Sequence, residues 1–174
     1  MVRHHDYNIA IVEAVSSKQF SRYWLHGGHL HADNKKMSKS LGNVYHTRDV
    51  LAKGYGGAEL RFFLIYGAYR EKLNFTFEKL EETSERLHSL QDMVADLQQT
   101  KSADQTKEEA AVTNEVTSTF ENHMNNDLDV KTAFDNLHEK VTKIHRNRES
   151  LSEIELKRVL NSLRRVDSVL QCIY

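Results

Sequence analysis

The strongest constraint on this chain is a pattern of apolar residues in its second half. From residue 76 onward, apolar side chains recur every three or four positions in four successive stretches. This spacing gathers them on one side of an α-helix. The chain has no proline, so no residue locks a kink into these stretches. Because one amphipathic helix cannot bury its apolar side alone, the pattern predicts an antiparallel helical bundle over residues 76–174.

Capping residues and a polar break divide this bundle into its helices. Thr76 is a suitable N-cap for the first helix, and Ser150 with Glu153 has the spacing of a capping box for the last. Residues 100–109 are polar and weakly periodic, which predicts a loop. The apolar positions of the four helices are, in order, Phe77, Leu80, Leu87, Leu90, Val94 and Leu97; Val112, Val116, Phe120 and Met124; Val130, Ala133, Phe134, Leu137, Val141 and Ile144; and Leu156, Val159, Leu160, Leu163, Val166, Leu170 and Ile173.

The first half of the chain differs in composition and in predicted structure. The glycines all precede residue 68, which marks residues 1–75 as a loop-rich first domain. The elements predicted there are a helix over residues 8–17, a strand over residues 25–32, a short helix from the N-cap Thr47 to Gly54, and a buried helix over residues 58–69.

A basic run in the first half carries the strongest chemical signal. It reads Lys35-Lys36-Met37-Ser38-Lys39-Ser40-Leu41-Gly42-Asn43. Its ammonium and hydroxyl groups together form the donor set that a polyphosphate needs. Gly42 permits a tight backbone turn. The run therefore indicates ATP chemistry, with a solvated basic surface turn as the alternative.

Around this run the chain resembles the class I aminoacyl-tRNA synthetases, whose signature loop reads KMSKS. The flanking residues resemble the cysteinyl-tRNA synthetase family in particular. Segments 4–10 and 20–28 are similar to that family's HHENEIA and FARYWLHNG stretches, and segment 124–133 is similar to its MDDDFNTPxA stretch. Segments that follow the family's order between these are 47–51, 60–64, 69–70 and 73–75.

The resemblance implies a mainly α fold, a reaction and a set of contacts. The fold is the remnant of a Rossmann-type catalytic domain with a stem-contact fold, followed by a helical bundle that binds tRNA near its anticodon arm. In the family, cysteine is adenylated with ATP and then transferred to tRNA. The catalytic residues would be Lys36 and Lys39, which stabilise the departing pyrophosphate. ATP would be contacted by Lys36, Met37, Ser38, Lys39 and Ser40, and Asn43 would fix the return of the loop.

The family's His-x-Gly-His signature is expected far upstream of the lysine loop, and the chain begins too late to contain that half. The run His26-Gly27-Gly28-His29 matches the signature letter for letter. It occupies the family's WLHNG position, however, and we interpret its histidines as strand or loop residues. We therefore predict the C-terminal portion, or a truncated relative, of a cysteinyl-tRNA synthetase that does not activate cysteine on its own.

The residues that would hold the family's zinc are mostly missing. That zinc is bound by two upstream cysteines, a histidine and a glutamate four residues beyond the histidine. His4 matches the histidine, but Asn8 stands at the glutamate position and the only cysteine is Cys172. We therefore expect no metal site, and surface or loop roles for the other histidines.

Composition favours a cytoplasmic protein. One cysteine excludes an intrachain disulfide framework. No long apolar run or signal-peptide pattern indicates a membrane or export. The net charge is −1 with 28% charged residues, so contact with a nucleic acid has to use local basic patches.

Basic residues gather in the last two predicted helices. They form either an ordinary solvated helix surface or a track that binds the phosphate backbone of tRNA. The candidate tRNA-binding residues are Lys140, Lys143, Arg146, Arg148, Lys157, Arg158, Arg164 and Arg165.

Two functional alternatives stay open. The chain is half of a split synthetase that works with a separately encoded N-terminal half, or it is a non-catalytic tRNA-binding paralogue that keeps the lysine loop as a remnant. The first alternative predicts an exposed apolar surface where the other half docks. The second predicts a polar, self-contained surface at the N-terminus.

Overall fold

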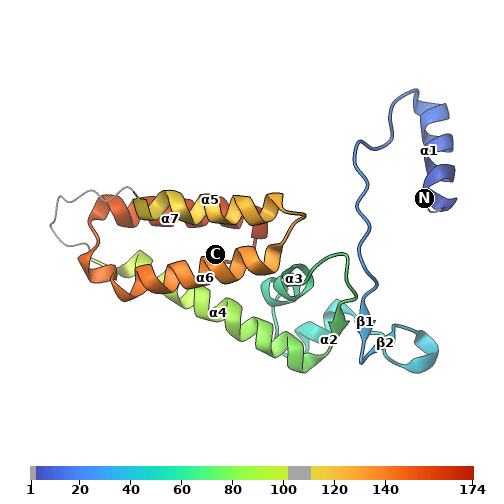
Figure 1. Cartoon of the computed structure of the whole chain (residues 1–174). Coiled ribbons are helices and arrows are strands. Elements are labelled where there is room, and N and C mark those ends of the chain that lie inside the picture. The colour runs from blue at the N-terminus through green and yellow to red at the C-terminus, as the bar shows by residue number, and fades with distance from the viewer. Residues whose placement is uncertain (1–2, 102–110) are drawn as a thin grey trace.

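The computed structural model describes residues 3–101 and 111–174. As predicted, the chain is mainly helical, and its three short strands form one small sheet in the order β2-β1-β3 (Figure 1). The α-helices are α1 (Arg3–Ser16), α2 (Thr47–Leu51), α3 (Gly57–Tyr66), α4 (Phe77–Gln99), α5 (Ala111–Asn125), α6 (Val130–Arg146) and α7 (Glu153–Leu170). The strands are β1 (His31–Ala32), β2 (Lys35–Lys36) and β3 (Asn74–Phe75), and the 3₁₀ turns are η1 (Lys39–Leu41) and η2 (Arg148–Ser150).

Helices α4, α5, α6 and α7 pack lengthwise around a shared apolar core (Figure 1). Helix α4 packs on α6 and α7, and α5 packs on the same two helices, so α6 and α7 lie diagonally opposite each other. Helices α4 and α6 run parallel, because their polar contacts join residues 49 positions apart along both helices. These pairs are Arg86–Asp135, Ser89–His138, Met93–Thr142 and Asp96–His145.

The core of these helices is built from the apolar stripes. In α4 the stripe positions buried in this core are Leu87, Leu90, Val94 and Leu97, whereas the buried Leu80 lies outside it. Phe62 of α3 is fully buried in the same core and packs against Phe134 of α6 with the rings tilted, 4.4 Å between ring centroids. Helix α3 is thereby fixed to the four long helices.

A second, smaller core lies beneath the sheet. Its buried residues are Val50, Phe63, Phe75 and Leu80. Because α3 contributes Phe62 to one core and Phe63 to the other, this helix joins the sheet to the long helices.

The structure corrects one predicted cap and confirms another. The hydroxyl of Thr76 accepts a hydrogen bond from the Lys79 amide at 3.2 Å, as expected of the N-cap of α4. The capping box of α7 is formed by Ser152 and Glu155, not by Ser150 and Glu153. Ser150 ends the 3₁₀ turn η2, so the last helix begins two residues later than the box motif predicted.

Several predicted boundaries in the first half also differ. The predicted strand over 25–32 is a strand only at His31–Ala32, because its sole parallel neighbour, β3, is two residues long. The first helix begins at Arg3 instead of residue 8, and the buried helix ends at Tyr66 before Gly67.

Thr47 is the first residue of α2, and the N-cap is His46. The backbone N–H of His46 donates to the Asp49 carboxylate at 2.8 Å, which replaces the predicted threonine cap. Most of the loop predicted over 100–109, from residue 102 on, lies outside the described residues. The side chain of Val112 also lies outside them.

Helix α1 lies apart from the other helices, at the end of an extended segment that runs toward β1 (Figure 1). None of the described helices combines the length and the apolar content that a membrane crossing needs.

Candidate functional site

The lysine run forms a short hairpin. Strand β1 pairs antiparallel with β2, with His31 opposite Lys36 and Ala32 opposite Lys35. The two residues between the strands, Asp33 and Asn34, both have left-handed φ angles, of 53° and 61°. Such a pair forms the tight two-residue turn that suits a twisted hairpin, and Asp and Asn tolerate the conformation better than most residues.

Asn43 closes the loop that follows the hairpin. Its side-chain amide donates a hydrogen bond to the Ala32 carbonyl at 3.0 Å and lies 3.4 Å from the Lys36 carbonyl. Its side-chain oxygen accepts a hydrogen bond from the Ser38 amide at 2.9 Å. Asn43 is buried, so these bonds are shielded from competing water. The side chain thereby ties both strands to the residues that return from the loop.

A 3₁₀ turn shapes the tip of this loop. It spans Lys39–Leu41 and ends at Gly42, whose φ of 65° favours glycine. The hydroxyl groups of Ser38 and Ser40 are hydrogen-bonded to each other at 2.7 Å. Each hydroxyl group keeps lone pairs or a proton for a further partner.

The lysine side chains of the hairpin point to solvent. Lys35 and Lys36 are exposed on β2, and Lys39 is exposed at the start of η1. Within the described part of the chain, none of these three lysines forms an ion pair. The hairpin therefore presents three ammonium groups that are available to an anion.

Two contacts that the sequence analysis missed anchor the hairpin to the small core. The hydroxyl of Tyr45 donates to the Asp33 carboxylate at 2.9 Å, and this hydrogen bond raises the pKa of Tyr45. The Asn34 amide donates to the side chain of Asn74 at 2.7 Å. The ring of Tyr45 packs against Phe75, with 5.2 Å between ring centroids. No spacing rule links these residues, which is why the sequence did not reveal them.

The histidines near the N-terminus form a small stack. Nδ1 of His5 lies 3.1 Å from Nε2 of His26, and the Trp24 ring packs on His5 with 4.6 Å between centroids. The His26-Gly27-Gly28-His29 run lies in the extended segment before β1 and begins no helix. Among the described residues, no three His, Cys, Asp or Glu side chains are grouped to hold a metal. Asn8 stands four residues beyond His4, where the resemblance expects a glutamate.

The predicted basic track is divided by the helix packing. Lys140, Lys143 and Arg146 belong to α6, whereas the other four helical candidates belong to α7, which lies diagonally opposite. Several of these cations are already engaged: Lys143 pairs with Glu139, Lys157 with Glu153, and Arg165 with Glu121. The structure therefore supports two separate basic strips instead of one.

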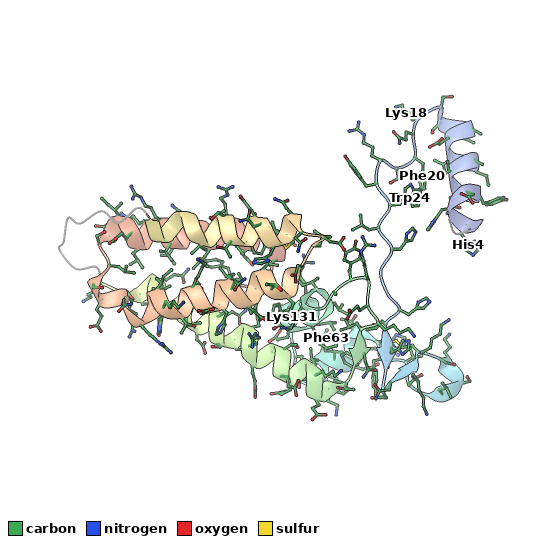
Figure 2. All side chains as sticks on the ribbon, viewed as in Figure 1. His4, Lys18, Phe20, Trp24, Phe63 and Lys131 are labelled. Atoms are coloured by element: carbon green, nitrogen blue, oxygen red, sulfur yellow. The ribbon has the colours of Figure 1, made fainter. Side chains whose placement is uncertain are left out.

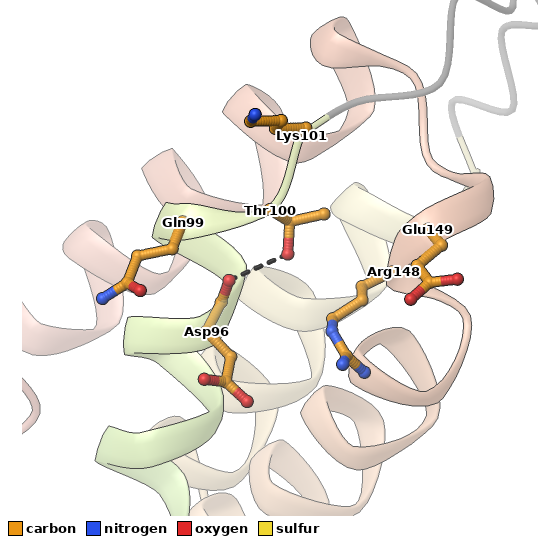
Figure 3. Close-up of a pocket in the computed structure, with 6 residues that line it drawn as sticks. All are labelled: Asp96, Gln99, Thr100, Lys101, Arg148 and Glu149. Carbon is orange, nitrogen blue, oxygen red and sulfur yellow. Dashed lines mark hydrogen bonds between the residues drawn. The ribbon is translucent and has the colours of Figure 1, made fainter.

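A cavity of about 400 Å³ lies where α4 ends beside the η2 turn (Figure 3). Arg148, one of the candidate residues, lines it and also donates to the His145 carbonyl at 3.1 Å. The other described lining residues are Asp96, Gln99, Thr100, Lys101 and Glu149. The lining contains charges of both signs.

Apolar side chains are exposed at the N-terminal end. Tyr7 and Val15 on α1 are 68% and 85% exposed, and Tyr23 on the extended segment is 82% exposed. Figure 2 shows Phe20 and Trp24 on the extended segment beside α1. These exposed apolar side chains lie among exposed polar residues of α1 and the extended segment, such as Asp6 and Lys18.

The chain is similar to known synthetases along nearly its whole length. Residues 1–85 match the family of tRNA synthetases class I (C) catalytic domain. Over 96% of the chain it is 36% identical to the cysteine–tRNA ligase of Chlamydia muridarum, and over 98% it is 33% identical to that of Protochlamydia amoebophila. The chain spans 38% and 36% of the lengths of these two relatives. The chain is therefore similar to a part of the cysteine–tRNA ligases, and its residues 1–85 are similar to a class I tRNA synthetase catalytic domain.

Proposed function

We propose that this chain supplies two parts of a cysteine–tRNA ligase: the hairpin that contacts the ATP phosphates and the helices that bind tRNA. It corresponds to the C-terminal portion of such an enzyme. The observation that carries this proposal is the hairpin, in which three lysines have no ion pair among residues 3–101 and 111–174 and Asn43 holds the backbone by hydrogen bonds.

The role of the hairpin is electrostatic. In cysteine activation, the cysteine carboxylate attacks the α-phosphorus of ATP, and the bond from that phosphorus to the departing pyrophosphate breaks. The ammonium groups of Lys36 and Lys39 stabilise the negative charge that grows on the pyrophosphate. Ser38 and Ser40 add hydroxyl donors, and the half-buried Met37 lies between Lys36 and Ser38 in the chain.

The long helices bind tRNA through phosphate contacts. The exposed cations of α6 and α7 are spread over two strips, so each strip contacts a different stretch of backbone. Arg146 is the strongest candidate on α6, because it is exposed and pairs with no acidic side chain in the described residues.

In the split-enzyme form of this proposal, a separate N-terminal segment holds the adenine and the amino acid. The exposed apolar surface of α1 and the extended segment favours docking of such a segment over a self-contained paralogue. A non-catalytic tRNA-binding paralogue is the second candidate, favoured by Asn8, which replaces the family's zinc-binding glutamate.

Pyrophosphate binding tests the hairpin directly. Adding pyrophosphate to the full chain should shift the amide NMR signals of residues 35–40, and Lys39→Ala should weaken binding by about tenfold, as expected for loss of one charge-assisted contact. Lys79→Ala, which removes an exposed lysine of α4, is the matched control. Equal weakening in both variants, or no shift at the hairpin, would contradict the proposal.

A further inference from the structure

Asp127 lies at a junction between the long helices and the loop over residues 67–73. Its carboxylate accepts two hydrogen bonds from Arg70, from Nε at 2.6 Å and from Nη2 at 2.9 Å. It also accepts one from the Tyr69 hydroxyl at 2.8 Å. The Arg70 guanidinium lies over the Tyr69 ring, 4.9 Å from its centroid. These contacts lower the pKa of Asp127 to about 2, through the hydrogen bond from Arg70 and then that from Tyr69.

The turn that carries Asp127 is tightly bonded. Asp127 and Leu128 both adopt left-handed conformations, with φ angles of 53° and 57°. The Leu128 amide donates to the Met124 carbonyl at 3.2 Å. Asp129, the N-cap of α6, accepts from the Thr132 amide at 3.1 Å. The carboxylate of Asp127 is therefore held on a rigid turn between α5 and α6.

The far side of the 67–73 loop holds the segment that leads into the lysine hairpin. The Gly28 amide donates to the Tyr69 carbonyl at 2.6 Å, and the His31 amide donates to the Leu73 carbonyl at 2.7 Å. A Cβ atom at Gly28 would lie 2.0 Å from the Glu71 carbonyl oxygen, so only glycine allows this approach. His31 in turn pairs with Lys36 across the hairpin.

We propose that Asp127 is a positioning residue for the lysine hairpin. Asp127 accepts hydrogen bonds from Tyr69 and Arg70. The loop that carries these two residues accepts hydrogen bonds from the Gly28 and His31 amides. Those bonds set where β1 and β2 begin. The link runs through contiguous hydrogen bonds from the turn between α5 and α6 to the lysine run. This chain of hydrogen bonds thereby fixes the position of a phosphate group at the hairpin relative to a tRNA bound on the helices. The role in placing tRNA and phosphate rests on the proposed function, whereas the hydrogen-bonded link from Asp127 to the hairpin does not.

The Arg70–Asp127 pair should stabilise the nearby backbone and not the whole fold. Both partners of the Arg70–Asp127 pair are more than half exposed, and exposed pairs contribute little to global stability. Loss of the Asp127 charge should therefore loosen the segment from Gly28 to His31 without unfolding the helices.

Hydrogen exchange on the full chain, without ligand, tests the link. Asp127→Asn keeps the shape of the side chain and tolerates the left-handed backbone, so it removes mainly the charge. We expect the amides of Gly28 and His31 to exchange at least about fivefold faster, and the buried Leu137 amide to be unchanged. Asp92→Asn, on the exposed side of α4, is the control.

A second variant separates positioning from general structure. If Arg70 and Asp127 act as a unit, Arg70→Gln should speed the same two amides, and the double variant should add little to either single change. Exchange at Gly28 and His31 within twofold of the parent, or an equal increase at Leu137, would overturn the proposal. Pyrophosphate titration of the parent chain is independent of this result, so failure of the proposed function would be recognised separately.

Discussion

The side-chain amide of Asn43 donates a hydrogen bond to the backbone carbonyl of Ala32 at 3.0 Å, across eleven positions of the chain. This bond joins the strand that enters the lysine hairpin to the residue that leaves it. The same side chain accepts from the Ser38 amide, so one buried group holds the loop on both sides. The lysine side chains between these residues are exposed, while hydrogen bonds to Asn43 hold the backbone around them.

Replacing Asn43 with alanine should free the loop. The change removes the hydrogen bonds to Ala32 and Ser38 and leaves the buried Ala32 carbonyl without its side-chain donor. We expect a loss of about 1–3 kcal/mol in unfolding free energy, measured by urea titration, and faster exchange of the Ser38 amide. Asn125→Ala, at an exposed position of α5, should change neither quantity. A stable Asn43→Ala variant with a protected Ser38 amide would contradict this role.

The sequence indicated the lysine loop and its glycine, because donor types and a turn residue can be read from local spacing. It did not indicate Tyr45, Asn74 or Asp127, which reach the hairpin or its supporting loop from distant segments. Contacts of this kind depend on how α3 and the long helices pack, and no local pattern encodes that packing.

The cap of α7 provides a direct comparison between two serines. Ser152 accepts from the Glu155 amide and its own amide donates to the Glu155 carboxylate at 2.8 Å. Ser152→Ala should therefore lower the thermal midpoint and cost about 0.5–2 kcal/mol. Ser150→Ala should have a much smaller effect, because Ser150 lies in the preceding 3₁₀ turn. Equal losses in the two variants would show that the helix begins at Ser150 after all.

The apolar stripes predicted the four long helices well, since helical spacing is a strong local signal. Their arrangement was harder to predict. The parallel contact between α4 and α6 arises because consecutive helices alternate in direction while α6 and α7 lie diagonally opposite. The same arrangement divides the basic residues into two strips, which a linear sequence does not reveal. The strand predicted over 25–32 is also shorter than expected, since β3 has only two residues that pair with it.

Acid should weaken the junction between α3, α4 and α6 at Asp135. Burial alone would raise the pKa of this carboxyl group, but hydrogen bonds from Lys131 and Tyr66 outweigh it and lower the pKa from its usual value. A lowered folded-state pKa stabilises the fold above the unfolded value, and this stabilisation is lost as the pH falls below it. Urea titrations between pH 7 and pH 2.5 should show this loss in the parent chain.

Asp135→Asn should reduce the acid dependence and cost about 1–3 kcal/mol at pH 7, because charge-assisted hydrogen bonds from Arg86 and Lys131 are weakened. Asp92→Asn is the matched control on the exposed side of α4. An acid profile identical in parent and Asp135→Asn chains would rule out Asp135 as the source.

Binding of tRNA should depend more on Arg146 than on Lys157. Arg146 has no acidic partner in the described residues, whereas Lys157 is paired with Glu153 on its own helix. Arg146→Ala should weaken tRNA binding and reduce the slope of log affinity against log salt by about 0.7–0.9, the value for one lost phosphate contact. Lys157→Ala should change the slope less. An unchanged slope in Arg146→Ala would remove the α6 strip from the tRNA-binding surface.

The most direct measurement is ATP–pyrophosphate exchange with cysteine, using this chain mixed with an N-terminal fragment of a cysteine–tRNA ligase that carries the His-x-Gly-His signature. We predict exchange in the mixture, none in either part alone, and at least about a hundredfold loss with Lys39→Ala, in line with removal of one group that stabilises the transition state. Absence of exchange from a mixture in which the two parts bind each other, or exchange that survives Lys39→Ala, would contradict the proposal that this hairpin serves the departing pyrophosphate.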